Sequence, residues 1–118
     1  GGRLDFGAPL EGRHLFIEVK SVTWVEKGVA LFPDGVTARG RRHLAALAAL
    51  AGRGHEAWQV FVVQREDAAA FRPAREVDPA YARELARVAA LGVRILVLRE
   101  KLNPPEITLA QTLPFELS

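Results

Sequence analysis

The stretch His14-Leu-Phe-Ile-Glu-Val-Lys-Ser-Val22 decides how the rest of the chain is interpreted. Its many β-branched and aromatic residues favour a strand. Side chains two residues apart on a strand point to the same side, so Glu18 and Lys20 share one face and Val19 points to the other. The stretch therefore predicts a strand on which a carboxylate and an ammonium group lie side by side.

The residues before this strand predict a hairpin partner for it. Residues 3–6 predict a short strand and residues 9–12 a turn. If the turn is centred near residues 10 and 11, Asp5 falls on the same face as Glu18, directly opposite it or one diagonal step away. A slip of one residue would move Asp5 to the other face.

The residues after this strand predict a further hairpin and then a helix. A turn at residues 26–28 and a strand at residues 29–32 complete an expected meander of antiparallel hairpins. A helix follows from Val36, with Asp34 or Thr37 as its cap. Apolar residues at spacings of three and four form its buried stripe, and glycines end it: Leu44, Leu47, Ala48 and Ala51, then Gly52 and Gly54.

The second half of the chain predicts buried strands around a second helix. The apolar runs at residues 58–63 and 93–98 are too short for helices and indicate strands covered on both faces. Between them, Asp78 and Pro79 begin a helix that Gly92 ends. One or two edge strands are expected in the tail, at residues 107–109 and 113–117. The predicted order is βββαβαβ plus a β tail, which indicates an α/β (α+β) fold in which a mixed β-sheet is flanked by helices.

The composition is that of a small globular domain. A length of 118 residues fits one domain, residues 1–118, and 49% hydrophobic with 25% charged residues argues against disorder. The chain has no cysteine, which excludes disulfides and thiolate metal sites and favours the cytoplasm. No apolar run approaches the roughly 20 residues of a membrane span, so no membrane association is expected. The chain also has no methionine, so we expect a fragment, a processed product or an engineered chain.

The charge of the chain is a weak signal for nucleic acid, because 16 basic and 14 acidic residues give a net charge of only +2. The clustering of basic residues is more informative. Arg39, Arg41, Arg42 and His43 crowd the start of the first predicted helix, and guanidinium groups bind phosphate well. The alternative is a solvated helix face in an arginine-rich protein, and composition alone favours that alternative.

If Asp5, Glu18 and Lys20 lie close together as expected, their side chains could bind a metal ion and act on a phosphodiester. Two carboxylates from adjacent strands offer oxygen ligands to Mg²⁺ or Mn²⁺. Such an ion polarises a phosphodiester and generates hydroxide from bound water. A neighbouring lysine orients or deprotonates that water and offsets charge on the phosphate. Taken alone, Glu-X-Lys is commonly just a solvent-exposed pair. A hairpin with Asp then Glu-X-Lys, followed by an arginine-rich helix, instead matches the central part of the PD-(D/E)XK nuclease fold, which is restriction-endonuclease-like.

Five segments of the chain allow a more specific comparison than this general pattern. They are Arg3-Leu-Asp-Phe6, Glu18-Val-Lys-Ser-Val-Thr23, Gly28-Val-Ala-Leu-Phe-Pro-Asp34, Val36-Thr-Ala-Arg-Gly40 with His43-Leu44, and Phe61-Val-Val-Gln-Arg-Glu-Asp67. Together they resemble the sugar fermentation stimulation protein family over nearly the whole chain. The resemblance implies a DNA-binding protein with a nuclease-like C-terminal domain, associated with regulation of sugar (maltose) use. It also implies that an oligonucleotide-binding barrel, and the first helix and strand of the nuclease core, lie outside residues 1–118.

The resemblance also assigns roles to single residues. Asp5 and Glu18 would be metal ligands, and Lys20 the catalytic or phosphate-orienting lysine. Further residues would contact nucleic acid: Thr37, Arg39, Arg41, Arg42, His43 and Gln64. Arg39 and His43 lie one helical turn apart, so both can reach one phosphate. The alternatives are a surface histidine at His43, a helix cap at Thr37 and a sheet-edge cap at Gln64.

Three functions remain open from the sequence. The first is a DNA-binding regulator that binds without sequence preference and keeps a nuclease-like metal site. The second is an active Mg²⁺-dependent nuclease. The third is a non-catalytic interaction module. Clustered carboxylates repel DNA unless a cation lies between them, so we expect a metal ion in the first two cases.

Overall fold

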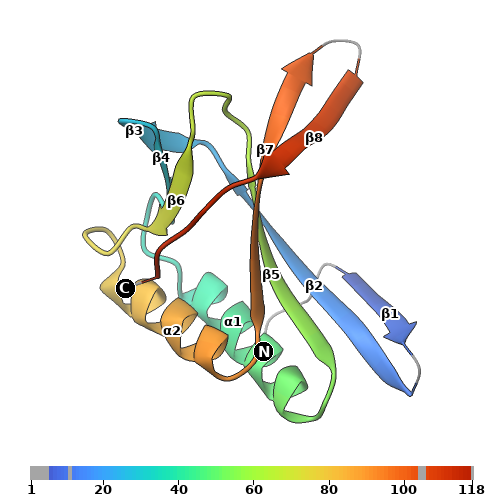
Figure 1. Cartoon of the computed structure of the whole chain (residues 1–118). Coiled ribbons are helices and arrows are strands. Elements are labelled where there is room, and N and C mark those ends of the chain that lie inside the picture. Colours follow the sequence, from blue (N-terminus) through green and yellow to red (C-terminus); the bar gives the residue numbers. More distant parts are fainter. Residues whose placement is uncertain (1–5, 11, 104–105, 118) are drawn as a thin grey trace.

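The central sheet of the protein has five strands in the order β1-β2-β5-β7-β8, as a computed structural model shows (Figure 1). The structure describes residues 6–10, 12–103 and 106–117. The strands of this sheet are β1 (Phe6–Leu10), β2 (Arg13–Val22), β5 (Glu56–Val63), β7 (Arg94–Asn103) and β8 (Glu106–Thr112). The strands predicted at residues 14–22, 58–63 and 93–98 are confirmed as β2, β5 and β7.

The inner strands of this sheet run parallel and its edges run antiparallel. β2 pairs in parallel with β5, and β5 with β7, while β1 and β8 pair antiparallel at the two edges. Parallel neighbours need long crossover connections, and these contain α1 (Ala38–Gly52) and α2 (Pro79–Ala90). Figure 1 shows both helices on the same face of the sheet. This arrangement confirms the mixed α/β class with helices packed on the sheet.

A second, three-stranded sheet corrects the expected meander. It has the order β3-β4-β6 and consists of β3 (Trp24–Glu26), β4 (Val29–Phe32) and β6 (Ala70–Pro73). The predicted turn between β3 and β4 is confirmed, with positive φ at Lys27 (50°) and Gly28 (81°), as a two-residue hairpin turn requires. β4 cannot extend the first hairpin, because both edges of β2 are already taken by β1 and β5. The sequence did not predict β6, which pairs in parallel with the distant β4.

The boundaries at the two ends of the chain also differ from expectation. The predicted strand at residues 3–6 lies outside the described residues apart from Phe6, and β1 continues to Leu10, which pairs with Arg13. Pro9 therefore lies in an edge strand, where a missing N–H is tolerated, rather than in the turn. At the other end, β8 includes the expected strand at 107–109, but 113–117 forms only an isolated bridge between Phe115 and Phe71.

Side-chain caps fix the starts of both helices. Thr37 caps α1, since its Oγ1 accepts a hydrogen bond from the Gly40 N–H at 2.9 Å, which decides between the two predicted candidates. Asp78 caps α2 as predicted, accepting from the Tyr81 N–H at 3.0 Å, and Pro79 follows it in the first turn. The first turns of both helices are therefore held by specific side chains.

The hydrophobic core lies between the helices and both sheets. The predicted stripe of the first helix is confirmed at its centre, where Leu44 and Leu47 are fully buried, and Leu85 and Val88 of α2 are fully buried as well. Aromatic rings join the layers: Phe61 of β5 stacks on Phe71 of β6 with centroids 4.5 Å apart, and Phe32 of β4 packs edge-on against Tyr81 of α2 at 5.4 Å. In the part of the chain that the structure describes, no helix is long and apolar enough to cross a membrane.

Candidate functional site

Glu18 lies on the face of β2 that the helices cover. Only 2% of its side chain is exposed, although a carboxylate is rarely buried without partners. Its neighbour in the parallel register is Gln59 of β5, which is fully buried on the same face. The site is therefore built on two central strands rather than on loops.

Glu18, Lys20 and His43 form a three-way contact at this position. Lys20 Nζ lies 3.1 Å and His43 Nδ1 lies 2.8 Å from the same oxygen, Glu18 Oε1, and the two nitrogens are 2.9 Å apart. The side chains of Glu18 and His43 are each 2% exposed, whereas that of Lys20 is 17% exposed. Lys20 therefore forms the solvent-facing edge of the cluster.

The protonation of His43 follows from its surroundings. Burial lowers the pKa of His43, the charge of Lys20 lowers it further, and Glu18 only partly opposes this. A neutral imidazole carries one N–H. With its hydrogen on Nδ1, His43 donates to Glu18 Oε1; with the hydrogen on Nε2, Nδ1 instead accepts from the Lys20 ammonium group.

The second carboxylate oxygen of Glu18, Oε2, differs from Oε1 in its hydrogen-bond partners. Among the described residues, none donates a hydrogen bond to Glu18 Oε2, although that atom is buried. A buried acceptor without a partner is costly, and native structures contain few of them. A carboxylate oxygen of this kind is a suitable ligand for a hard cation such as Mg²⁺ or Ca²⁺.

The protein ligands for such a cation are few. Within residues 6–10, 12–103 and 106–117, no three His, Cys, Asp or Glu side chains come together at metal-binding distance. The predicted second ligand, Asp5, lies outside the described residues. The hairpin pairs Phe6 with Ile17 and Leu10 with Arg13, so its turn lies one residue later than predicted, and the role of Asp5 stays a prediction. A cation here would complete its shell with water and phosphate oxygens, as Mg²⁺ commonly does.

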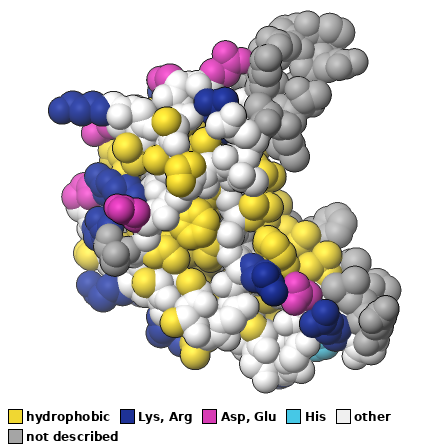
Figure 2. Space-filling model, viewed as in Figure 1, with side chains coloured by type: hydrophobic (Ala, Val, Ile, Leu, Met, Phe, Trp, Pro, Cys, Tyr) yellow, Lys and Arg dark blue, Asp and Glu magenta, His cyan; other side chains and the backbone are white. Residues whose placement is uncertain are grey.

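The predicted nucleic-acid residues fall into separate groups. Arg39 and Arg42 are exposed on α1, and Gln64 is exposed directly after β5. Arg41 instead faces α2, where it lines a cavity of about 380 Å³ with Ala80, Arg83, Glu84 and Arg87. Thr37 acts as the cap of α1, as its alternative role predicted. Figure 2 shows Lys and Arg side chains scattered over one face of the molecule, with Asp and Glu among them.

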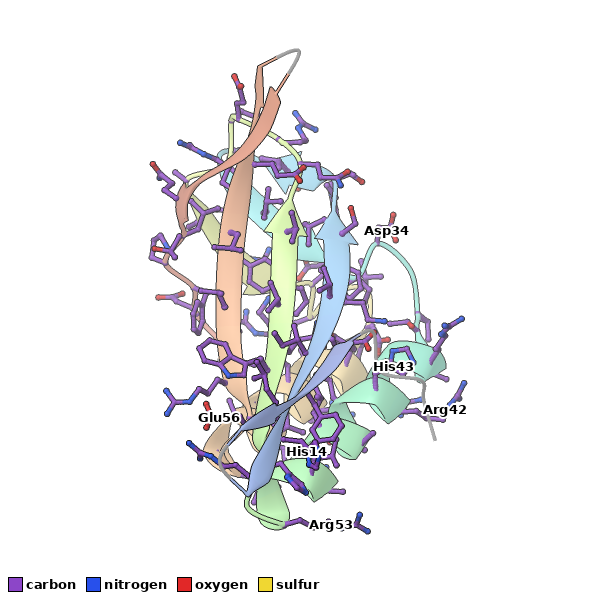
Figure 3. The ribbon with its side chains drawn as sticks, turned by 90° about the vertical axis from the view of Figure 1, so that its right-hand side faces the viewer. His14, Asp34, Arg42, His43, Arg53 and Glu56 are labelled. Carbon is purple, nitrogen blue, oxygen red and sulfur yellow. The ribbon has the colours of Figure 1, made fainter. Side chains whose placement is uncertain are left out.

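His43 is not the surface residue that the alternative interpretation assumed. Its ring points from α1 toward β2, while Arg42, the preceding residue, points away from the strands (Figure 3). The structure therefore brings Glu18, Lys20 and His43 together and leaves Arg42 on the outer side of α1, whereas the charge of the exposed Arg39 still acts on His43.

Two residues of the site were not identified from the sequence. Gln59 Nε2 donates to the backbone oxygens of Glu18 (3.1 Å) and Val60 (3.3 Å). Tyr81 of α2 is fully buried, and burial raises the pKa of its phenol, with further increases from the negative charges of Glu18 and Asp78. A polar residue inside the apolar run at residues 58–63 was the signal that could have identified Gln59.

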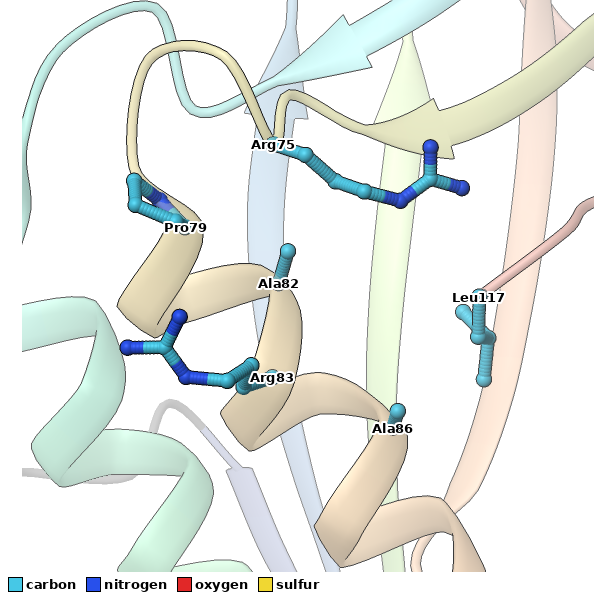
Figure 4. A pocket seen from close by; sticks show the side chains of 6 residues that line it. All are labelled: Arg75, Pro79, Ala82, Arg83, Ala86 and Leu117. Atoms are coloured by element: carbon cyan, nitrogen blue, oxygen red, sulfur yellow. The ribbon is translucent and has the colours of Figure 1, made fainter.

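A second feature is a cavity of about 320 Å³ on the α2 side of the molecule. It is lined by Arg75, Pro79, Ala82, Arg83, Ala86 and Leu117 (Figure 4). None of these residues belongs to the Glu18 cluster, so the cavity is separate from the chemistry described above.

Comparisons with known proteins agree on one family. Residues 1–106 match a family model described as "SfsA: Sugar fermentation stimulation protein RE domain". The chain is 45% identical over 114 residues to the sugar fermentation stimulation protein homolog of Citrifermentans bemidjiense, covering 97% of this chain and 49% of that protein. It is 42% identical over 120 residues to the homolog of Pseudomonas putida, covering 100% of this chain and 51% of that protein.

A solved structure gives the same result. The chain resembles Pyrococcus furiosus SfsA, solved in complex with Ca²⁺, with a TM-score of 0.82 and 32% identity. The match covers 87% of this chain and 45% of that one. The chain thus spans about half the length of the curated relatives and of the solved structure that it matches.

Proposed function

Because the chain belongs to the sugar fermentation stimulation protein family, we propose that it is the nuclease-like part of a DNA-binding protein and that its Glu18 carboxylate binds a divalent metal ion. The contact that carries this proposal is the 3.1 Å ion pair between Lys20 Nζ and Glu18 Oε1 at a nearly buried position. An acid and a lysine held together in this way are the minimal protein groups for handling a phosphodiester.

The metal ion has support from two sides. Lys20 and His43 both occupy Glu18 Oε1, so the carboxylate keeps acceptor sites at Oε2. The related Pyrococcus furiosus protein was solved with Ca²⁺, and Ca²⁺ and Mg²⁺ both choose oxygen ligands. We expect Mg²⁺ or Mn²⁺ as the working ion and Asp5 as the second carboxylate. When bound, the ion would polarise a phosphate and lower the pKa of a water molecule.

Lys20 would contact the phosphate of the DNA. Its side chain is 17% exposed, and its ammonium group lies between the buried carboxylate and solvent. From there it can hold a water molecule for attack and offset negative charge on the phosphate oxygens. His43 supports this geometry from α1, because its Nδ1 lies 2.8 Å from Glu18 Oε1.

DNA would lie along α1. Arg39 and Arg42 are exposed there, and their guanidinium groups suit phosphate oxygens. Contacts of this kind position a duplex without reading its bases, so we expect binding with little sequence preference. A part in regulating sugar use, as the family name suggests, would act through this DNA binding.

Cleavage of DNA is the second candidate function. The observation that favours cleavage is the pairing of Lys20 with the buried Glu18. A protein that only binds DNA gains nothing from a carboxylate beside its phosphate contact. Binding and cleavage share the same residues, so the experiments must separate them.

Metal titration tests the proposal directly. Calorimetry with Mn²⁺ or Ca²⁺ should show one site in the wild type and greatly weakened binding in Glu18→Gln, which keeps the shape but removes the charge. Glu66→Gln is the matched control, because Glu66 is exposed in the loop after β5. Equal metal affinity in both variants would remove Glu18 from the site. Gel-shift assays with DNA, with and without the metal ion, then test the partner.

A further inference from the structure

The cavity of about 380 Å³ between α1 and α2 is lined mostly by charged side chains. One lining residue belongs to α1 and the others to α2: Arg41, then Ala80, Arg83, Glu84 and Arg87. Three of these five residues are arginines and only one is acidic. None of them belongs to the Glu18 cluster, so the proposed metal site does not explain why positive charge gathers here.

The single carboxylate of this cavity is already paired with one of its arginines. Arg87 Nε donates to Glu84 Oε1 at 2.6 Å, and Arg87 Nη2 donates to Glu84 Oε2 at 2.9 Å. Each oxygen of Glu84 therefore accepts one bond of the same guanidinium fork. The charges of Glu84 and Arg87 compensate each other, which leaves the charges of Arg41 and Arg83 to be accounted for.

Arg41 is half-buried, yet its guanidinium group has no hydrogen-bond acceptor among the described residues. Its Nε atom is enclosed by the protein and is one of the few buried side-chain atoms there without a partner. A guanidinium group has five N–H donors, and enclosing it is costly unless acceptors replace the lost water. An acceptor held in the cavity that Arg41 lines would supply them.

Arg83 reaches the same cavity from α2. Spacings of three and four residues place Ala80, Arg83, Glu84 and Arg87 on one side of this helix. Figure 4 shows the Arg83 side chain extending from α2 toward the neighbouring α1. Within the part of the chain that the structure describes, no carboxylate pairs with Arg83, since Glu84 beside it is bound by Arg87. Arg41 and Arg83 thus bring two uncompensated guanidinium groups to one cavity from two helices.

We propose that this cavity is an anion site in which Arg41 and Arg83, with Arg87 beside them, bind a phosphoryl group. Guanidinium forks match phosphate oxygens. A tetrahedral phosphate offers oxygens in several directions, so it can accept from both helices at once, whereas a planar carboxylate suits one fork. A phosphate monoester carries about −1.5 to −2 charges at neutral pH, against the two positive charges of Arg41 and Arg83. The volume of the cavity lies within the usual range of ligand sites.

A purely structural role of Arg41 is the competing explanation. Its positive charge lies close enough to Asp78 and Glu84 to act on both carboxylates, so it could serve only to hold α1 against α2. That role predicts that loss of Arg41 lowers stability, and it gives Arg83 no part. The anion site instead predicts that loss of either arginine weakens phosphate binding, because both guanidinium groups contact the same ligand.

The first experiment is an NMR titration with inorganic phosphate, with chloride keeping the ionic strength constant. The backbone amide signals of the lining residues should shift and saturate in the wild type. Arg41→Gln and Arg83→Gln should each weaken phosphate binding roughly tenfold, as loss of a charged hydrogen-bond donor does.

The control for this titration is Arg53→Gln, which removes the same charge from an exposed position after α1. It should bind phosphate as the wild type does. Urea unfolding in chloride shows whether each variant is folded, and Arg83→Gln keeps the test valid if Arg41→Gln is unstable, because Arg83 is exposed. The site is overturned if no shift saturates, if Arg53→Gln weakens binding equally, or if Arg83→Gln binds phosphate like the wild type.

The second experiment identifies which molecule carries the phosphoryl group, the DNA backbone or a small phosphate monoester. Only the DNA source rests on the proposed function. DNA affinity across a salt series decides between them: a slope reduced by about one in Arg83→Gln, but not in Arg53→Gln, assigns the site to a DNA phosphate. An unchanged slope, together with phosphate binding that Arg83→Gln loses, assigns it to a small molecule. If the wild type binds no DNA, the proposed function fails, while the phosphate titration still decides whether the anion site exists.

Discussion

The backbone N–H of Thr37 donates a hydrogen bond to Asp78 Oδ2 at 2.9 Å. Thr37 is the cap of α1, and Asp78 is the cap of α2, so one carboxylate joins the first turns of both helices. The position of α1 determines where His43 meets Glu18. Asp78 therefore supports the site from outside it, since its side chain accepts from Thr37 and Tyr81 rather than from Lys20 or His43.

Replacing Asp78 should loosen both helices at once. Asp78→Ala removes the acceptor of the Thr37 and Tyr81 N–H groups, and we expect a loss of about 2–4 kcal/mol in the free energy of unfolding. Urea unfolding measures this. The control is Asp34→Ala, because Asp34 was the other candidate cap and is exposed. A loss no larger than that of the control would contradict the shared cap.

The stability from Asp78 should depend on pH in a defined direction. Burial works against the ionised carboxylate, but the N–H groups of Thr37 and Tyr81 outweigh it and hold the pKa of Asp78 below its ordinary value. The stability is therefore complete above the unfolded pKa of about 3.9 and disappears as the pH falls through the lower folded value. The difference in unfolding free energy between wild type and Asp78→Ala should shrink over that acid range and stay constant at neutral pH.

Gly40 should resist substitution although it lies inside a helix. A Cβ there would sit 2.9 Å from Thr37 Cγ2 and 3.1 Å from Tyr81 Cε2. Gly40→Ala should cost about 1–3 kcal/mol through overcrowding, despite the better helix propensity of alanine. Thermal unfolding should show the opposite sign for Gly52→Ala, where nothing lies within 4 Å of an added Cβ. Equal effects of the two substitutions would count against the close packing at Gly40.

Substitution of Lys20 should separate DNA cleavage from metal binding. If the protein cuts DNA, Lys20→Gln should reduce nicking of plasmid DNA in Mg²⁺ or Mn²⁺ by roughly 100-fold or more. Metal binding should persist in calorimetry, because the carboxylates remain. Lys27→Gln, in the exposed turn between β3 and β4, is the control. Full activity of Lys20→Gln would show that another group orients the water.

The exposed arginines of α1 should make DNA binding depend on salt. Each phosphate contact releases condensed counterions, so Arg39→Ala or Arg42→Ala should reduce the slope of log affinity against log salt by about one. Arg53→Ala is the matched control, since Arg53 lies at the far end of the same helix from Arg42 (Figure 3). An unchanged slope in the Arg39 and Arg42 variants would exclude this side of α1 as the contact surface.

The parts of the fold that depend on local pattern could be predicted from the sequence. Alternation placed Glu18 and Lys20 on one face of a strand, and their 3.1 Å contact confirms it. Capping and spacing rules located both helices. The second sheet could not be predicted, because β6 is a four-residue strand whose pairing with β4 depends on distant residues.

The same distinction applies to the candidate site. That His43 and Lys20 would share one oxygen of Glu18 depends on how α1 docks on β2. The roles of Gln59 and Tyr81 depend on parallel pairing and on the packing of the two helices, which no local rule contains. Spacing therefore identified the chemistry of Glu18 and Lys20 but not the groups that hold it in place.

The pairing of β2 with β5 has a consequence for how the protein acquires its site. Glu18 and Gln59 are 41 residues apart in the chain, and contacts at such separations form late because a long loop must close first. A nascent chain exposes Glu18, Lys20 and the arginines of α1 before β5 has been synthesised. The carboxylate can be enclosed only after β5 has joined the sheet, so the completion of folding, rather than the presence of these side chains, would set the moment at which a metal ion finds an ordered site.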